Sequence, residues 1–165
     1  MFFLLISPRE NVIHWSYNNK LKLEDFQGDP IDKYMCLSVT VLIGTVYCNN
    51  GKTAYTSDVV FDKDLSWVGE NAKDNYILNH EQKHFDLTEL FSRKIRFHFD
   101  YANYSCDQMK EANLYVSKMA KNLQIRQHLY DYETRHSLNV KNQTIWNNNI
   151  QIELNKYSEY ASDLD

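Results

Sequence analysis

The chain has little glycine and little proline. It contains 4 Gly and 2 Pro among 165 residues, well below the usual frequencies of about 7% and 5%. Because these residues are the main breaks in regular structure, their scarcity predicts long uninterrupted elements and favours helices over a sandwich with many turns. The length predicts a single domain over residues 1–165, since one core usually serves about 100 to 200 residues.

An excess of basic charge is also missing. The chain has 18 Lys and Arg against 22 Asp and Glu, and its formal net charge is −4. A protein that binds nucleic acid needs clustered Lys and Arg to neutralise phosphates, so we expect no nucleic-acid partner. Hydrophobic residues make up 43% and charged residues 24%, which excludes the disordered classes and is typical of a globular domain.

Long hydrophobic runs and cysteine motifs are absent too. The apolar run at residues 2–6 has no basic stretch before it and is too short for a membrane span or a complete signal peptide. We expect no membrane span, and a first strand or the remnant of a signal sequence at this run. The 3 Cys include no CxxC pair, so neither a zinc knuckle nor a disulfide framework is indicated, and a bridge between Cys36 and Cys48 stays open.

The residue pattern predicts strands first and helices afterwards. Residues 34–48 and 53–61 are rich in Val, Ile, Thr and Tyr, and residues 49–51 between them tolerate positive φ, so this region predicts a β hairpin. Three later segments carry apolar residues at helical spacing, at about residues 75–98, 105–130 and 142–160. A small β region followed by about three helices is the α+β arrangement.

The most informative segment lies inside the first predicted helix. His80, Glu81 and His84 form an HExxH pattern. Four residues are slightly more than one turn, so the two imidazoles project from one face and can bind the same ion. Zinc bound in this way lowers the pKa of its water towards about 7, and Glu81 is placed to accept the proton as general base.

A zinc site also needs a third protein ligand. No Gly-x-x-His follows His84, which excludes the metzincin arrangement. In an antiparallel second helix, residues at about 116–124 would face the two histidines, and no acid occurs between Glu111 and Asp131. The cluster at the end of that helix contains His128, Tyr130, Asp131, Glu133 and His136. We favour His136 as the third ligand.

Other polar groups near the motif have predicted supporting roles. Tyr130 is a candidate oxyanion donor, since amide hydrolysis needs a hydrogen-bond donor besides zinc, although a packed aromatic is the commoner use of tyrosine. Asp86 and Asp131 are candidates to hold the second nitrogens of the ligand imidazoles. The solvated face of the long helix is expected to carry Lys83, Arg93, Lys94 and Arg96.

Taken in order, these motifs resemble a bacterial family of predicted secreted zinc-dependent proteases that is known as a domain of unknown function. The matching strings are LEDFQG at residues 23–28, FDK at 61–63, SWV at 66–68, HEQKHFDLTEL at 80–90 and YDYETRH at 130–136, with Gln143 and Trp146. The resemblance covers most of the chain, and its HEQxHFD string is far more specific than HExxH alone. Ser137 is a departure, because the family usually has Gly after this His.

The resemblance implies a zincin-like fold, a secreted or periplasmic protein, zinc and peptidase activity. On this interpretation the zinc ligands are His80, His84 and His136. Glu81 then activates the water that attacks a peptide or protein substrate, with Tyr130 as the oxyanion donor.

Two alternatives to the peptidase stay open. One is a non-enzymatic, zinc-stabilised module that binds peptides. The other is a hydrolase that acts on a non-peptide amide, such as a cell-wall linkage. A fourth protein ligand, such as Asp131 or Glu133, would favour the structural module, because catalytic zinc keeps one coordination position open.

Overall fold

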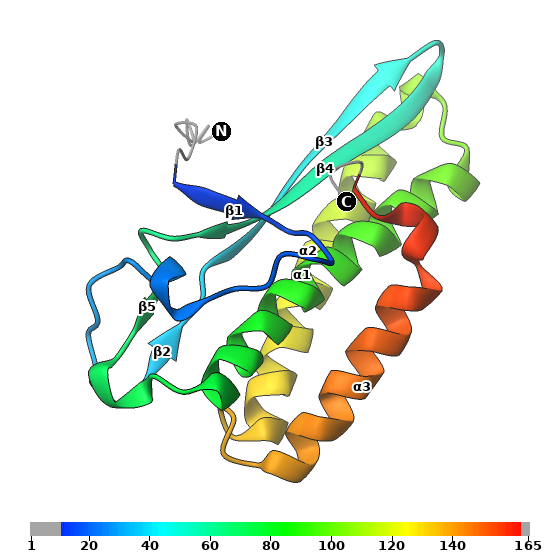
Figure 1. Ribbon diagram of the computed structural model, residues 1–165. Coiled ribbons are helices and arrows are strands. Elements are labelled where there is room, and N and C mark those ends of the chain that lie inside the picture. Colours follow the sequence, from blue (N-terminus) through cyan, green and yellow to red (C-terminus); the bar gives the residue numbers. More distant parts are fainter. Residues whose placement is uncertain (1–10, 163–165) are drawn as a thin grey trace.

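The computed structural model describes residues 11–162, and the apolar run at residues 2–6 lies outside them. The strands come first, in the order β1 (Val12–His14), β2 (Cys36–Leu37), β3 (Thr40–Asn49), β4 (Lys52–Asp62) and β5 (Trp67–Val68). The helices that follow are α1 (Asn75–Ala102), α2 (Met109–Thr134) and α3 (Val140–Lys156). The α+β class and the order of its elements are therefore confirmed (Figure 1).

The strands form two small antiparallel sheets. In the larger one β4 lies between β1 and β3, and in the smaller one β2 pairs with β5. β3 and β4 are the predicted hairpin, which closes with Asn49 opposite Lys52. Asn50 and Gly51 make the turn with φ of 49° and 80°. A two-residue turn of this kind needs positive φ at both positions, which Asn and Gly adopt most readily.

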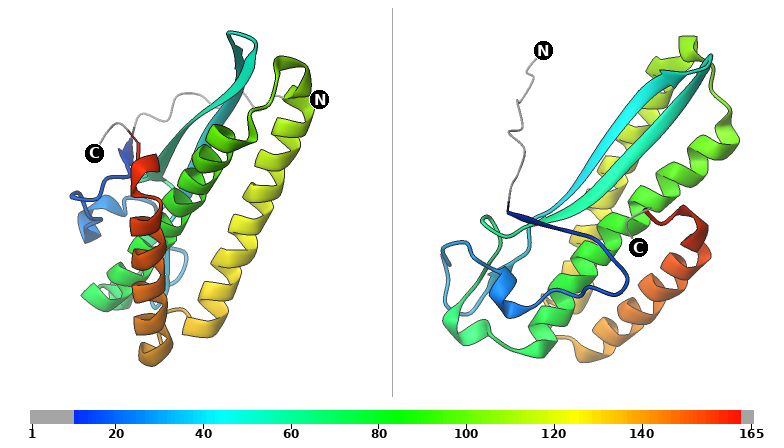
Figure 2. Two further views of the ribbon diagram at one scale, coloured as in Figure 1. Left: turned by 90° about the vertical axis from the view of Figure 1, so that its right-hand side faces the viewer. Right: turned by 45° about the horizontal axis from the view of Figure 1, so that its top comes forward.

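The core forms around α1. This helix contacts the β3–β4 hairpin and also α2 and α3, as the views in Figures 1 and 2 show. Phe85 and Leu90 of α1 are fully buried and belong to one cluster with Phe61 of β4 and Ile150 of α3. No helix in residues 11–162 is long and apolar enough to cross a membrane.

Helix boundaries follow their capping residues. Asp74 caps α1 by accepting from the backbone N–H groups of Tyr76 and Ile77 at 2.7 Å each. Asn103 ends the helix in the left-handed conformation. A 3-10 turn at Cys106–Gln108 comes next, so α2 begins at Met109 and ends later than predicted.

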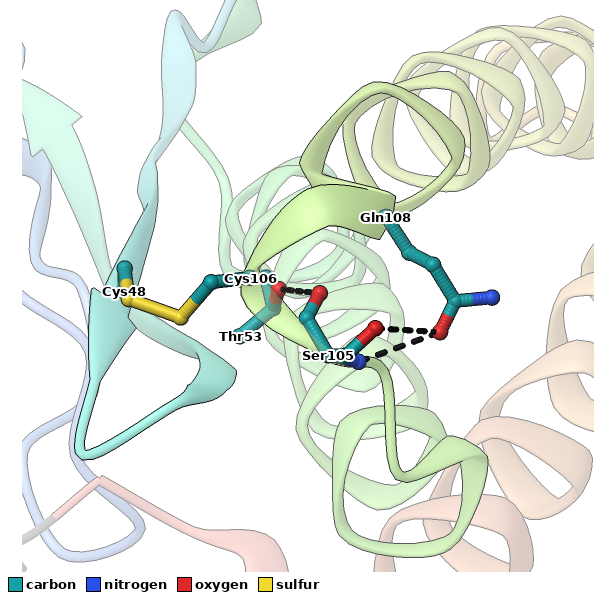
Figure 3. The surroundings of a disulfide bond; sticks show 5 residues. All are labelled: Cys48, Thr53, Ser105, Cys106 and Gln108. Atoms are coloured by element: carbon teal, nitrogen blue, oxygen red, sulfur yellow. Dashed lines mark hydrogen bonds between the residues drawn. A yellow bond between two sulfur atoms is a disulfide. The ribbon is translucent and has the colours of Figure 1, made fainter.

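A disulfide bond joins Cys48 of β3 to Cys106 in the turn before α2 (Figure 3). Beside it, the hydroxyl of Thr53 donates to the carbonyl of Ser105 at 2.7 Å, so the tip of the hairpin is attached to the loop between α1 and α2. Cys36 is free. The two bonded cysteines are 58 residues apart. A crosslink over a loop of that length stabilises the fold by about 4 kcal/mol in the chain-entropy model.

Candidate metal centre

A cleft of about 690 Å³ opens beside the first half of α1. His80, Glu81 and His84 of α1 line it. Residues 34–40 contribute one part of the lining, and residues 135–138, just after α2, contribute another. The HExxH segment therefore faces a cavity and not the core alone.

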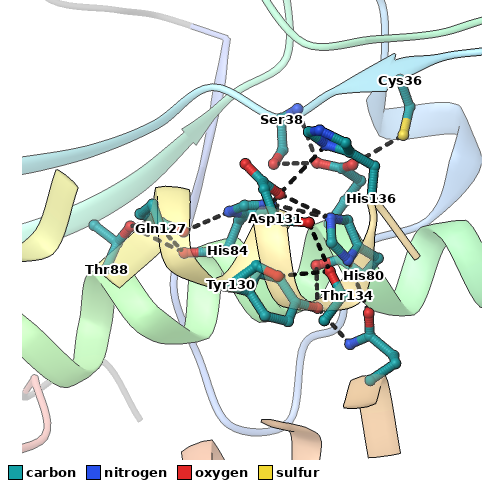
Figure 4. Close-up of polar contacts among 12 residues, drawn as sticks. Cys36, Ser38, His80, His84, Thr88, Gln127, Tyr130, Asp131, Thr134 and His136 are labelled. Carbon is teal, nitrogen blue, oxygen red and sulfur yellow. Dashed lines mark hydrogen bonds and ion pairs between the residues drawn. The ribbon is translucent and has the colours of Figure 1, made fainter. Parts of the chain in front are cut away.

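Three side-chain atoms converge in this cleft (Figure 4). Nε2 of His80 and Nε2 of His84 lie 3.1 Å and 2.9 Å from Oδ1 of Asp131. The two Nε2 atoms are 3.2 Å apart. Ligand atoms bound to one tetrahedral ion at about 2.0–2.1 Å lie about 3.3 Å from one another. The three atoms are thus spaced as a set of ligands that could hold a metal ion.

A glutamine of α3 fixes the tautomer of His80. Oε1 of Gln143 faces Nδ1 of His80 at 2.8 Å, while the amide nitrogen of Gln143 donates to the hydroxyl of Tyr130 and, at 2.7 Å, to Asn147. Because the amide nitrogen is already donating, the amide oxygen is the acceptor and Nδ1 of His80 carries the proton. In the neutral ring, Nε2 is then a lone pair directed at Asp131.

A glutamine of α2 has the same effect on His84. The amide nitrogen of Gln127 donates to the carbonyl of His84 at 3.0 Å and to the hydroxyl of Thr88 at 3.2 Å. Its amide oxygen therefore accepts from Nδ1 of His84, with which it forms a hydrogen bond. Nε2 of His84 is again left as the lone pair that faces the carboxylate.

The centre therefore gathers three acceptor atoms, and no donor from residues 11–162 lies between them. Two imidazole lone pairs and a carboxylate oxygen repel one another at such distances unless a cation lies among them. A proton can satisfy part of the group, whereas a metal ion satisfies all three atoms.

The pKa values of His84 and Asp131 are shifted in the directions that favour a positive charge at the centre. Burial alone would lower the pKa of His84, but the hydrogen bond that the protonated ring donates to Asp131 and the charges of Glu81 and Asp131 raise it above the usual value. Burial would raise the pKa of Asp131, but hydrogen bonds donated by the protonated rings of His80 and His84 hold it well below the usual range.

Glu81 lies in the cleft but outside the group of converging atoms. One carboxylate oxygen accepts from Sγ of Cys36 at 2.8 Å, and the other accepts from the backbone N–H of Ser38 at 3.0 Å and from its hydroxyl. A carboxylate offers about four acceptor sites, so these three donors fix its orientation and leave one site for water or substrate.

Asp131 occupies the position that the sequence predicted for His136. His136 lines the cleft, but its Nδ1 is 3.6 Å from Oδ1 of Asp131 and its side chain is 69% exposed. The difference comes from the register of α2. The turn between the helices moves the facing segment about two turns beyond residues 116–124, so that Gln127 faces His84 and Asp131 faces both histidines.

Tyr130 lies behind the centre and not in the cleft. It is fully buried, and its ring stacks on that of His80 with the centroids 4.5 Å apart. Its hydroxyl donates to the carbonyl of His80 at 3.3 Å and accepts from Gln143. Burial raises the pKa of this phenol. An oxyanion donor must reach the cleft, so this position does not suit the role predicted for Tyr130.

Asp86 has a structural place as well. Its buried carboxylate accepts from Nε1 of Trp15 at 3.0 Å, from the amide of Gln82 at 2.8 Å and from Lys83 at 2.6 Å. It therefore anchors the N-terminal segment to α1 and holds no imidazole. Of the two glutamines that do hold the imidazoles, Gln143 is among the residues of the resemblance, where it has no predicted role. Gln127 has no predicted role either, although Gln127 and Asp131 share the one-turn spacing of His80 and His84.

The structure thus brings His80, Glu81, His84 and Asp131 into one cleft and places His136 beside them. Comparisons with known protein families, with curated proteins and with solved structures find no match for this chain.

Proposed function

We propose that the protein is a zinc-dependent peptidase with a zincin-like fold, in which His80, His84 and Asp131 hold the ion. The convergence of their three acceptor atoms at 2.9–3.2 Å is the observation that carries this proposal. Catalytic zinc commonly has three protein ligands of these types, with one position left for water or substrate. When bound, the ion would polarise the substrate carbonyl and make water more acidic.

Glu81 is the general base in this proposal. Cys36 and Ser38 hold its carboxylate in the cleft, next to the ligand group. Glu81 takes a proton from the attacking water as the water oxygen bonds to the carbonyl carbon. It then delivers that proton to the leaving nitrogen as the C–N bond breaks, and the products are a carboxylic acid and an amine.

The cleft suits a peptide better than a very polar substrate. Its lining includes the large apolar side chains of Met35, Leu37 and Leu138, which are 51%, 46% and 82% exposed. Its volume of about 690 Å³ lies within the usual range for ligand sites. Apolar walls around a few polar groups fit the side chains of a peptide, whereas the polar groups act on its backbone.

We also propose that the protein is exported, to the periplasm or the medium. The bond between Cys48 and Cys106 supports this, because disulfides form and persist in oxidising compartments. Thiol titration of the denatured, unreduced protein should find one free thiol, that of Cys36. A titre of all three thiols in protein exported by its host would contradict the assignment.

Metal analysis together with peptide hydrolysis tests the proposal. Protein purified without added metal should contain an equimolar amount of zinc, and Asp131→Ala should lose it. Glu81→Gln should keep zinc but lose hydrolysis of a mixed peptide library. The control is His14→Ala, because His14 pairs with Asp58 at 2.8 Å outside the cleft and should keep both properties.

Three results would count against the proposal. Undiminished zinc in Asp131→Ala removes the ligand assignment, and turnover by Glu81→Gln removes the base. Iron in place of zinc points to the oxygen chemistry of two-histidine, one-carboxylate centres. Zinc without peptide hydrolysis favours the structural module or a non-peptide amide as substrate.

A further inference from the structure

His136 reaches the cleft from a strained turn. Arg135, His136 and Ser137 all have positive φ, of 51°, 50° and 74°. For residues other than glycine this conformation costs roughly 1–2 kcal/mol each, and such strain is concentrated at functional sites. The backbone N–H of His136 donates to the carbonyl of Asp131 at 3.0 Å. The turn therefore brings His136 back beside the last turn of α2 and into the cleft lining.

His136 is not prepared as a ligand in the way that His80 and His84 are. Each of those rings has a glutamine oxygen on Nδ1 that fixes its tautomer, as ligand histidines usually do. The side chain of His136 makes no hydrogen bond within residues 11–162, and its approach of 3.6 Å to Asp131 is longer than one. Figure 4 shows its ring on the opposite side of Asp131 from Tyr130. The N–H of His136 is thus left for a group in the cleft.

The proposed reaction needs such a donor. Attack on an amide carbonyl places negative charge on its oxygen, and a fixed N–H or O–H donor on that oxygen speeds the reaction. The hydroxyl of Tyr130 is buried and occupied, and Glu81 is an acceptor. Arg135 and His128 also line the cleft, but His136 is the one whose ring lies beside the ligand carboxylate.

We infer that His136 is a catalytic residue that donates a hydrogen bond to the carbonyl oxygen of the scissile bond as its charge develops. This inference rests on the proposed peptidase function. It gives the two residues different roles: Asp131 completes the set of metal ligands, and His136 acts on the substrate.

The first test measures metal content and turnover in the same variants. His136→Ala should keep an equimolar amount of zinc and lose about 10²–10³-fold in kcat, with little change in KM. His136→Gln should recover part of that loss, because its amide can donate. His14→Ala is the matched control, and thermal unfolding of each variant separates loss of the donor from loss of the fold.

The second test needs no turnover. A peptide phosphonamidate carries a tetrahedral, charged oxygen in place of the carbonyl, so His136→Ala should weaken its binding by about 10-fold or more. Acetohydroxamate, which binds zinc without that oxygen, should bind the variant and the parent protein equally well. Calorimetry on the zinc-loaded proteins measures both affinities.

Each contrary result is specific. Loss of zinc from His136→Ala would show that His136 is a ligand and would overturn the inference. Equal phosphonamidate affinity in variant and parent, or a parent protein that does not bind this analogue, would overturn it as well. A zinc-loaded parent that binds the analogue but hydrolyses no peptide would defeat the peptidase proposal, while the comparison of analogue affinities still decides the role of His136.

Discussion

Two clusters of polar side chains lie close together along α1, and their hydrogen-bonding groups differ. The first is the candidate metal centre, and the second is formed by Glu89, Arg93 and Arg96. In the second, Glu89 is 1% exposed and one of its carboxylate oxygens accepts from Nε of Arg93 at 2.8 Å and from Nη2 of Arg96 at 2.9 Å. Arg93 is therefore in the core and not on the solvated face predicted for it. This cluster joins donors to an acceptor within the chain, whereas His80, His84 and Asp131 bring only acceptors together.

The comparison shows how a structural cluster differs from a ligand set. A carboxylate shared by two guanidinium groups has its donors supplied by the chain itself. Convergent acceptors, of which the two imidazoles are each oriented by a glutamine amide, are stable only with a cation. Both clusters are partly or fully buried beside α1, so burial and charge alone do not distinguish them, whereas the direction of their lone pairs does.

The largest expected effect is on the Glu89 cluster. Glu89→Ala leaves the guanidinium groups of Arg93 and Arg96 without their shared carboxylate, so we expect a loss of about 3–5 kcal/mol in the free energy of unfolding. Urea unfolding measures this loss. The exposed acid Glu111 provides the control, since Glu111→Ala should change stability by about 0.5 kcal/mol or less. A loss of less than about 1 kcal/mol for Glu89→Ala would show that the cluster is dispensable.

The second expected effect comes from removing the metal. A ligand at 100 times its Kd stabilises the folded state by about 2.7 kcal/mol. Chelation should therefore lower the Tm of the parent protein and leave that of His80→Ala unchanged. Glu89→Ala, if it folds, should still respond to the chelator. A parent protein with the same Tm before and after chelation would argue against a metal centre.

The third expected effect tests the tautomer argument. Gln127→Leu removes the acceptor for Nδ1 of His84, and loss of such an outer partner typically weakens metal binding by about 10- to 100-fold. Competition with a chromogenic zinc chelator measures the affinity. Gln124→Leu, at an exposed position on the same helix, should have no effect. Equal affinities in the two variants would mean that the amide of Gln127 does not prepare His84 for the ion.

A fourth effect depends on pH and on the metal-free protein. The pKa of His84 is raised on folding, so its stabilisation is full below about pH 6.5 and is lost as the pH rises through the folded pKa. The pKa of Asp131 is lowered, so its stabilisation is present above about pH 3.9 and is lost as the pH falls through the folded pKa. The chelated protein should therefore be most stable in mildly acidic solution. His84→Gln should remove the decline on the alkaline side, and a profile identical to that of the parent would contradict the assignment.

The parts of the fold that the sequence predicted are those set by neighbouring residues. The turn at Asn50 and Gly51, the three helices and the spacing of His80 and His84 all depend on contacts within a few residues. The position of Asp131 depends instead on where α2 begins, and a shift of two turns in that start exchanges one set of facing residues for another. The pairing of Cys48 with Cys106 is equally non-local, because it depends on how the hairpin lies against the loop before α2.

The smallest expected effect concerns the strain beside the metal centre, which the Glu89 cluster on its regular helix does not share. Ser137 has a φ of 74°, a conformation that glycine adopts most readily. Ser137→Gly should raise stability by about 1 kcal/mol, because glycine adopts this conformation without strain. Ser117→Gly, at an exposed position inside α2, should lower stability by about 0.5 kcal/mol, because glycine is a poorer helix former than serine. If Ser137→Gly were destabilising instead, the buried side chain of Ser137 would contribute more than its backbone costs, and the turn that holds His136 would be a packed feature instead of a strained one.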